Sequence, residues 1–254
     1  MQHLIEKMKT AGGKLSFYYR PLNGGEAVAY NADEPLIAAS IIKIPIMIEA
    51  FRRFESGELD RNAVHVLREE EKKPSCGALN RMHAGLEVTM RDLVDLMIVL
   101  SDNTATNIMI DYLGVDAVNA TMRAYGATVS TLRRKLFDPS GIANGLRNVV
   151  CAGEIGMLLE KMARGELISP AASEEMVEIL KNQKLNGKFP FFLKSRGIKS
   201  AHKTGEDDGI THDAAIIFAK QPFVLCMFSN ETDVPAFERI MQDTALELAL
   251  LNEQ

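Results

Sequence analysis

The chain has 254 residues, of which 46% are hydrophobic and 25% charged, and its formal net charge is −5. These values are ordinary for a globular protein, and the length allows one large domain or two interleaved subdomains around a sizeable core. No cluster of lysine and arginine is long enough to follow a phosphate backbone, so we expect no nucleic-acid partner.

No apolar run approaches the roughly 20 residues that span a bilayer, so we expect no membrane attachment. The first residues, MQHLIEKMKTAGG, are mixed in charge and lack the continuous apolar segment of a signal peptide. We therefore expect a cytoplasmic protein from the sequence as it stands, and an exported one if a leader has been removed. Cys76, Cys151 and Cys226 are widely spaced and form no Cys-x-x-Cys pair, which predicts free thiols.

The N-terminal region predicts a helix followed by a hairpin. Helix formers over residues 2–11 end at a double glycine, and two strand-like runs over 14–20 and 26–31 flank the turn sequence PLNGG. The next segment is apolar nearly all round, which predicts a buried helix that ends near Gly57. Because proline suits a helix only in its first turn, Pro45 requires this helix to begin near Ser40 or to bend there.

The patterns from about residue 60 to residue 195 are mostly helical, and strand signals return only near the C-terminus. Helices are predicted over residues 89–100, with Thr89 as N-cap, and over 104–114, 152–167, 171–183 and 234–251. A loop is predicted over residues 137–148, and strands over 197–205, 211–219 and 223–230. This order lacks the alternation of strand and helix that builds a parallel sheet.

We therefore predict a fold of the α/β (α+β) class with two subdomains: an antiparallel sheet flanked by helices, and an inserted all-helical subdomain. The whole chain, residues 1–254, is expected to be a single domain. Its α/β subdomain would comprise about residues 1–58 and 196–254, and its helical subdomain about 59–195. A ligand site is expected in the cleft between them.

Three short motifs carry chemistry. Ser40 and Lys43 would share one face of a helix, where a lysine can activate the weakly nucleophilic serine. Ser101-Asp102-Asn103 places a hydroxyl, a carboxylate and an amide at one helix junction. Lys203-Thr204-Gly205 lies on a predicted strand, where Gly205 permits close approach of a ligand. In a second Ser-x-x-Lys, Ser200 and Lys203 would face opposite sides of that strand, so Ser200 is interpreted as structural.

Together and in this order, the motifs are typical of class A β-lactamases and penicillin-binding proteins. The sequence resembles the class A β-lactamase family over most of the chain from about residue 15 to residue 250. The segment RDLVDLMIVLSDNTATNIMIDYLG is similar to the central segment of that family, and AHKTGEDDGITHDAAII is similar to its downstream strand pair.

The resemblance implies a catalytic role for three residues. Ser40 would be the acylated nucleophile, Lys43 its partner base, and Ser101 a proton relay to the leaving nitrogen. Two lysines close together would lower each other's pKa, which a lysine base requires near neutral pH.

The resemblance also implies a set of substrate-binding groups on the strand and beside it. Asn103 would hold the amide side chain of the substrate, and Lys203 and Thr204, which precede Gly205, would bind its carboxylate. The backbone N–H groups of Ser40 and Glu206 would form the oxyanion hole, a task that suits the N-terminal end of a helix.

The chain departs from the family pattern in two places. Residues 133–148 lack the glutamate that releases the acyl-enzyme in the family, and Asp138 is the only carboxylate there. Asp138 is either a turn cap with Pro139 or a shorter deacylating carboxylate. His212 stands where many relatives carry arginine, and it would either bind a carboxylate when protonated or stay neutral beside Asp213.

The first functional hypothesis is a serine β-lactamase-like hydrolase that opens β-lactam amides through an acyl-Ser40 intermediate. The first alternative is a penicillin-binding D,D-peptidase or esterase with slow β-lactam deacylation, and the second is a non-catalytic sensor of β-lactams or peptidoglycan fragments. The expected partner is a small-molecule substrate, and a monomer is expected. Because no His/Cys/Asp cluster has ligand spacing, neither a metal nor another cofactor is expected.

Overall fold

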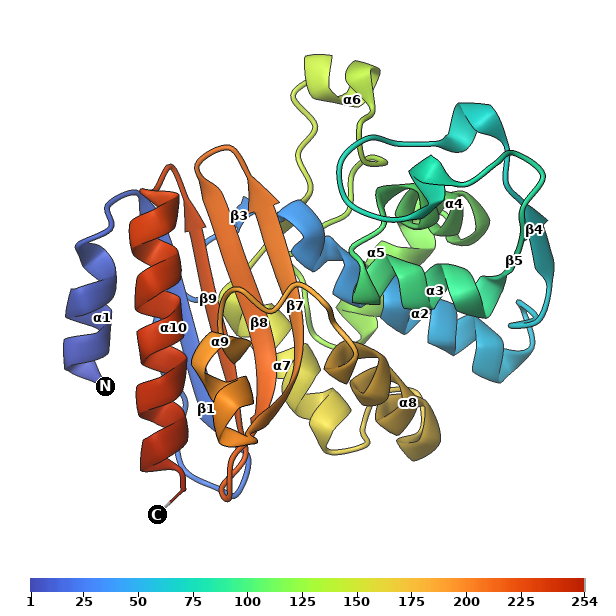
Figure 1. Cartoon of the computed structure of the whole chain (residues 1–254). Helices are drawn as coiled ribbons and strands as arrows, with labels where there is room; N and C mark the ends of the chain where they lie inside the picture. Colours follow the sequence, from blue (N-terminus) through green and yellow to red (C-terminus); the bar gives the residue numbers. More distant parts are fainter. Residues whose placement is uncertain (254) are drawn as a thin grey trace.

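The central element is a five-stranded antiparallel sheet with the strand order β2-β1-β9-β8-β7 (Figure 1). The computed structural model describes residues 1–253. The strands are β1 Lys14–Pro21, β2 Val28–Tyr30, β7 Lys199–Asp207, β8 Ile210–Phe218 and β9 Phe223–Asn230. β1 pairs with β9, so the early hairpin and the late strands share one sheet. The predicted antiparallel sheet flanked by helices is therefore confirmed.

The helices cover both faces of the sheet and form a block beside it (Figure 1). They are α1 Gln2–Lys9, α2 Lys43–Ser56, α3 Met90–Val99, α4 Asn103–Leu113, α5 Val115–Ala124, α6 Pro139–Ala143, α7 Ala152–Ala163, α8 Pro170–Lys181, α9 Pro190–Leu193 and α10 Val234–Leu251. Short 3₁₀ turns occur at Ala39–Ile42, Glu69–Glu71, Leu79–Arg81 and Lys194–Arg196. No helix within residues 1–253 has the length and apolar character needed to cross a membrane.

The sheet is covered on both faces, so the side chains of β8 and β9 are buried almost without interruption rather than alternately. One face packs against α1, α9 and α10 in a core that includes Phe17, Phe223 and Phe237. The other face packs against α7, and the same core continues into the helical block through α2, α3, α4 and α8. Every residue of β9 is buried.

The buried helix predicted after Ser40 is α2, and its start has the form that Pro45 requires. A 3₁₀ turn over Ala39–Ile42 leads directly into α2, so Pro45 lies in the first helical turn, where a missing N–H costs nothing. α2 ends at Gly57, which has a φ of 74°. Ser40 thus lies at the N-terminal end of α2, where the helical block meets the sheet.

The structure contains several short helices and strands that the sequence analysis did not predict. The loop predicted over 137–148 contains α6, which begins because Asp138 caps it and Pro139 occupies its first position. The chain also forms two short ladders, β3 Leu36–Ile37 with β6 Val149–Val150, and β4 Val64–Val66 with β5 Glu87–Thr89. α5, β3, β4, β5, β6 and α9 were not predicted, because runs this short or weakly patterned give little periodic signal.

Candidate active site

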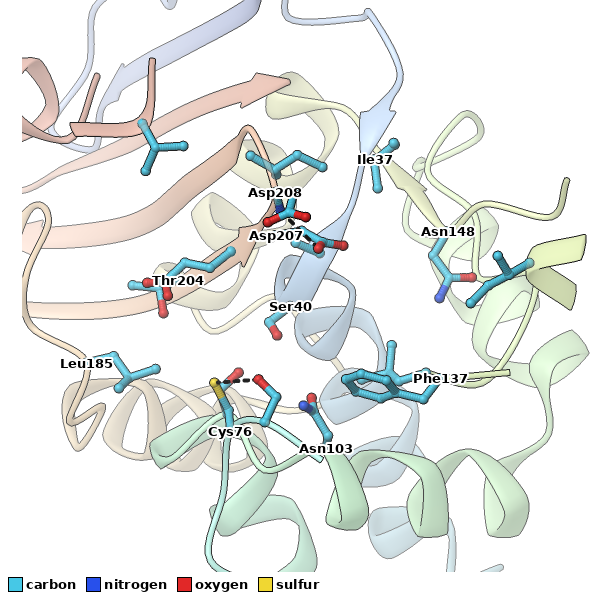
Figure 2. A pocket seen from close by; sticks show the side chains of 18 of the residues that line it. Ile37, Ser40, Cys76, Asn103, Phe137, Asn148, Leu185, Thr204, Asp207 and Asp208 are labelled. Atoms are coloured by element: carbon cyan, nitrogen blue, oxygen red, sulfur yellow. Dashed lines mark hydrogen bonds between the residues drawn. The ribbon is translucent and has the colours of Figure 1, made fainter. Parts of the chain in front are cut away.

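A pocket of about 540 Å³ lies where β7, the N-terminal end of α2 and the start of α4 come together. Ser40, Ser101, Asn103 and Thr204 line it, and the loop before α6 closes one side. Figure 2 shows the Ser40 side chain pointing into this pocket, with Thr204 on one side and Asn103 and Phe137 on the other. All three sequence motifs therefore contribute to one cavity.

The two motif lysines meet at the hydroxyl of Ser101. Lys43 Nζ donates to Ser101 Oγ at 3.0 Å, to Ser101 O at 2.8 Å and to Asn103 Oδ1 at 2.9 Å. Lys203 Nζ donates to the same Ser101 Oγ at 3.0 Å and to Thr204 O at 2.9 Å. Both lysines are fully buried, and their ammonium groups are fixed by these bonds. The cluster joins residues from three separate parts of the chain.

The Ser101-Asp102-Asn103 turn is held in place by the loop over residues 74–79. Asp102 caps α4 by accepting a bond from Ala105 N at 2.9 Å, and its other oxygen accepts from Ala78 N at 2.7 Å and Leu79 N at 2.9 Å. A Cβ on Gly77 would lie 2.3 Å from the Asp102 carboxylate carbon, and the φ of Gly77 is +118°. Only glycine fits there, so this position fixes the approach of the loop to Asp102.

The same loop binds Asn103 directly. Asn103 Nδ2 donates to Pro74 O at 3.1 Å, and the backbone N–H of Asn103 donates to Cys76 O at 3.2 Å. Because Asn103 Oδ1 accepts from Lys43, both ends of this amide are assigned and its orientation is determined. Asn103 is thus positioned before any substrate arrives.

Burial changes the acid–base properties of both lysines. Removal from water lowers the pKa of Lys43 to about 7, against the opposing influence of Cys76 and Asp102. Burial also lowers the pKa of Lys203 well below its usual value, and the charges of Lys43 and Lys188 lower it further. The expected mutual influence of the lysines thus acts on Lys203, whereas burial is what lowers the pKa of Lys43.

Asp138 is not among the residues that line the pocket. Its carboxylate accepts hydrogen bonds from residues of α6 instead. Oδ1 accepts hydrogen bonds from Ser140 Oγ at 2.7 Å, Ser140 N at 3.1 Å and Gly141 N at 3.1 Å. The bond from the Ser140 hydroxyl and the bonds from these backbone N–H groups lower the pKa of Asp138. Of the two interpretations of Asp138, the structure has the geometry of the cap that precedes Pro139.

Leu136 and Phe137 form the pocket wall that precedes Asp138. The backbone of Leu136 is fixed by Asn107, which donates to Leu136 O and accepts from Leu136 N, both at 2.8 Å. This wall is apolar, and it presents no group that can take a proton from water.

His212 is fully buried and holds the small β3 strand against the sheet. Its Nε2 donates to Ile37 O at 2.8 Å, and its Nδ1 accepts from Ser229 N at 3.1 Å. These partners define a neutral imidazole, and burial lowers the pKa of His212 to about 4. Both ring nitrogens are occupied, which leaves neither for a ligand, and the histidine beside Asp213 is His202, at 3.0 Å.

The motifs did not reveal a third buried lysine at the pocket. Lys188 Nζ donates to Glu206 Oε1 at 2.8 Å and to Gly205 O at 3.2 Å, so it contacts the strand directly after Lys203-Thr204. The only sequence signal is the apolar run Phe189-Pro190-Phe191-Phe192-Leu193, which predicts that its neighbours are buried.

The remaining candidate groups are three free cysteines: Cys76 is half-buried and lines the pocket, whereas Cys151 and Cys226 are buried. Within residues 1–253, no group of three or more His, Cys, Asp and Glu side chains is placed to hold a metal ion.

Comparisons with known proteins identify the family and the fold of the chain. A family model described as the β-lactamase enzyme family matches residues 1–249. The chain belongs to that family. It is 30% identical to a β-lactamase of Sphaerobacter thermophilus of known structure, with a TM-score of 0.88 and coverage of 98% of this chain and 97% of that one.

Two further proteins are similar to this chain at lower identity. Beta-lactamase 3 of Bacillus cereus is 26% identical over 242 residues, which are 90% of this chain and 73% of that protein. A mutant of PBP-A, solved as an acyl-enzyme complex with penicillin G, has a TM-score of 0.88 at 23% identity and covers 98% of this chain and 94% of its own. At that identity the likeness to PBP-A concerns the fold alone.

Proposed function

We propose that this protein is a class A-type serine hydrolase that opens β-lactams and related acyl compounds through a covalent acyl-Ser40 intermediate. The observation that carries the proposal is the buried Lys43, whose pKa of about 7 leaves a large neutral fraction at physiological pH. A neutral amine has the lone pair that a general base needs. Ser40 lines the same pocket at the N-terminal end of the α2 segment.

In the acylation step, Lys43 takes the proton of Ser40 Oγ as that oxygen attacks the carbonyl carbon. The Oγ–C bond forms, the C–N bond of the lactam breaks, and the leaving nitrogen receives a proton from Ser101. Lys43 then returns its proton to Ser101 along the 3.0 Å contact between Nζ and Oγ. The positive end of the α2 segment would stabilise the oxyanion, with the backbone N–H groups of Ser40 and Glu206 as its donors.

The proposed substrate contacts lie on two sides of the pocket. Asn103, already oriented by Lys43, would bind the amide of the substrate side chain. Thr204 and Lys203 would bind a carboxylate, whose charge favours protonation of Lys203. Neither Asp138 nor His212 has a role in this proposal, because the polar atoms of both are used within the protein.

The composition of the pocket wall also favours a second candidate, a penicillin-binding D,D-peptidase or esterase that releases β-lactams slowly. Leu136 and Phe137 line the pocket and belong to the segment, residues 133–148, where the resemblance would place the deacylating glutamate, and neither side chain can activate a nucleophile. Acylation would then be much faster than release, and a penicillin adduct would persist.

An intact-mass time course with a penicillin and a cephalosporin tests both candidates, with free β-lactam followed in the same samples. Adduct formation in the native protein and none in Ser40→Ala is the result expected from an acyl-Ser40 mechanism. Several turnovers per protein would identify a β-lactamase, and a persistent adduct would direct attention to peptides and esters. An adduct that forms equally in Ser40→Ala would refute the assignment of the nucleophile.

A further inference from the structure

Lys188 is a buried cation held directly behind the pocket wall. Its side chain is 2% exposed, and the backbone on either side of it is anchored: Gln242 donates to Gly187 O at 2.8 Å, and Phe189 N donates to Asp213 Oδ2 at 3.1 Å. These bonds fix the position of the Lys188 backbone, from which the side chain extends. A buried ammonium requires an anionic partner, because an unpaired buried charge is strongly disfavoured.

The first partner of Lys188 is the carboxylate of Glu206, at 2.8 Å. Glu206 lines the pocket, its side chain is 57% exposed, and within residues 1–253 its carboxylate forms no other hydrogen bond or ion pair. Glu238 lies further away, at 3.7 Å, and one of its oxygens also accepts a bond from Thr211 at 2.9 Å. Glu206 is therefore the partner that can rotate into water most easily.

Glu206 also lies on the face of β7 that a substrate would contact. Residues two apart on a strand share a face, so the side chains of Thr204 and Glu206 point the same way. Both line the pocket. A ligand anion bound beside Thr204 would thus meet the carboxylate of Glu206 rather than the ammonium behind it.

We propose that Lys188 is an anion-binding group of the pocket and that the Glu206 carboxylate occupies it in the free protein. This inference rests on the proposed function, because it concerns the same substrate pocket. A substrate carboxylate must displace Glu206 to pair with Lys188, and the released Glu206 turns into water. The Glu206 carboxylate therefore weakens the binding of acyl compounds whose carboxylate lies beside Thr204, although Thr204 and Lys203 still bind that group, and it affects uncharged analogues much less.

Equilibrium binding to the Ser40→Ala protein tests this competition without requiring acylation. The ligands are benzylpenicillin, which carries a carboxylate, and its methyl ester, which does not; dissociation constants are measured by titration calorimetry or ligand-observed NMR. Adding Glu206→Gln should tighten binding of benzylpenicillin about tenfold, the scale of one charge-assisted hydrogen bond. Binding of the methyl ester should change less than about twofold.

Asp207→Asn is the matched control, because it removes the same charge from the next residue of the pocket rim. The Asp207 carboxylate accepts a bond from Asp208 N at 2.9 Å, which asparagine retains, and it makes no contact with Lys188. Adding Lys188→Met to Glu206→Gln should abolish the gain for benzylpenicillin. Circular dichroism establishes that each variant is folded, and the comparison of Glu206→Gln with Asp207→Asn stands without the Lys188 variant.

Equal tightening by Glu206→Gln and Asp207→Asn would overturn the proposal, because it would indicate a general field effect of the rim. Unchanged benzylpenicillin binding in Glu206→Gln, or no binding of either ligand to any variant, would overturn it as well. The proposed function is judged separately, by the mass adduct of the protein that retains Ser40. If no adduct forms, the proposed function fails, but the dissociation constants can still be measured and still test the competition between Glu206 and a ligand carboxylate.

Discussion

Lys43 and Lys203 donate hydrogen bonds to a single atom, Oγ of Ser101, each at 3.0 Å. A hydroxyl oxygen has two lone pairs, so accepting from both lysines leaves its own proton free to point elsewhere. The pocket, which Ser101 also lines, is the open direction. In the proposed mechanism, the Ser101 hydroxyl would therefore donate its proton to the leaving group, and Lys43 would replace that proton.

The pH dependence of acylation should therefore report the ionisation of Lys43. Because burial lowers the pKa of Lys43 to about 7, the neutral base is the minor form below pH 7 and the major form above it. The second-order rate constant for acylation should fall about tenfold per pH unit below pH 7 and level off near pH 8. Mass spectrometry of the adduct between pH 5.5 and pH 9 measures this profile.

Lys43→Arg provides the control for this profile, since a guanidinium keeps its proton at every pH in the range. Its acylation rate should be at least about a thousandfold lower and should not recover with rising pH. A native profile that is flat from pH 5.5 to pH 9 would contradict the role of Lys43 as the base.

The sequence was sufficient to predict the fold class and to single out Ser40, Ser101, Asn103 and Thr204, which the structure brings to one pocket, because these predictions depend on strong local signals. β8 and β9 contain continuous apolar runs, and the capped helix after Thr89 has apolar residues at helical spacing. The three motifs lie at element ends that the structure brings to one pocket. Their roles in the reaction stay predictions until the adduct is measured.

The contacts that set the chemistry were not predictable in the same way, because they join residues far apart in the chain. Lys188 reaches Glu206 only because the segment before α9 folds against the end of β7. For His212, the neighbour Asp213 gave the wrong partner: successive side chains of a strand point to opposite faces, and His212 binds Ile37 and Ser229 instead. Such pairings depend on tertiary packing.

Gly77 should be needed for the Ser101-Asp102-Asn103 turn. In Gly77→Ala the new Cβ would meet the Asp102 carboxylate at 2.3 Å, on a backbone with a φ of +118°. We expect a loss of about 2–4 kcal/mol in the free energy of unfolding, measured with urea, and an acylation rate at least about tenfold lower. The clash displaces Asp102, and with it the acceptors of Lys43.

Gly24→Ala is the matched control, because Gly24 has a φ of +108° but no heavy atom within 4 Å of the position that a Cβ would take. It should lose only about 1–2 kcal/mol from backbone strain and acylate at the native rate. Similar acylation rates in the two variants would show that the loop contact with Asp102 does not position the site.

The lifetime of the acyl-enzyme should depend on position 136 rather than on Asp138. Leu136 lines the pocket with its backbone fixed by Asn107, whereas the carboxylate of Asp138 caps α6. Leu136→Glu would place a carboxylate in the pocket wall, where it can take a proton from the water that attacks the ester. We expect the penicillin adduct of Leu136→Glu to disappear at least about tenfold faster than that of the native protein.

Two controls separate general-base catalysis from a merely looser loop. Leu136→Gln has nearly the same shape as Leu136→Glu but no basic carboxylate, so its adduct should persist as in the native protein. Asp138→Asn retains an acceptor for the N–H groups of Ser140 and Gly141, and its adduct lifetime should stay within about twofold of the native value. A large increase in adduct lifetime in Asp138→Asn would instead assign deacylation to Asp138, and the water would then have to approach from the α6 side.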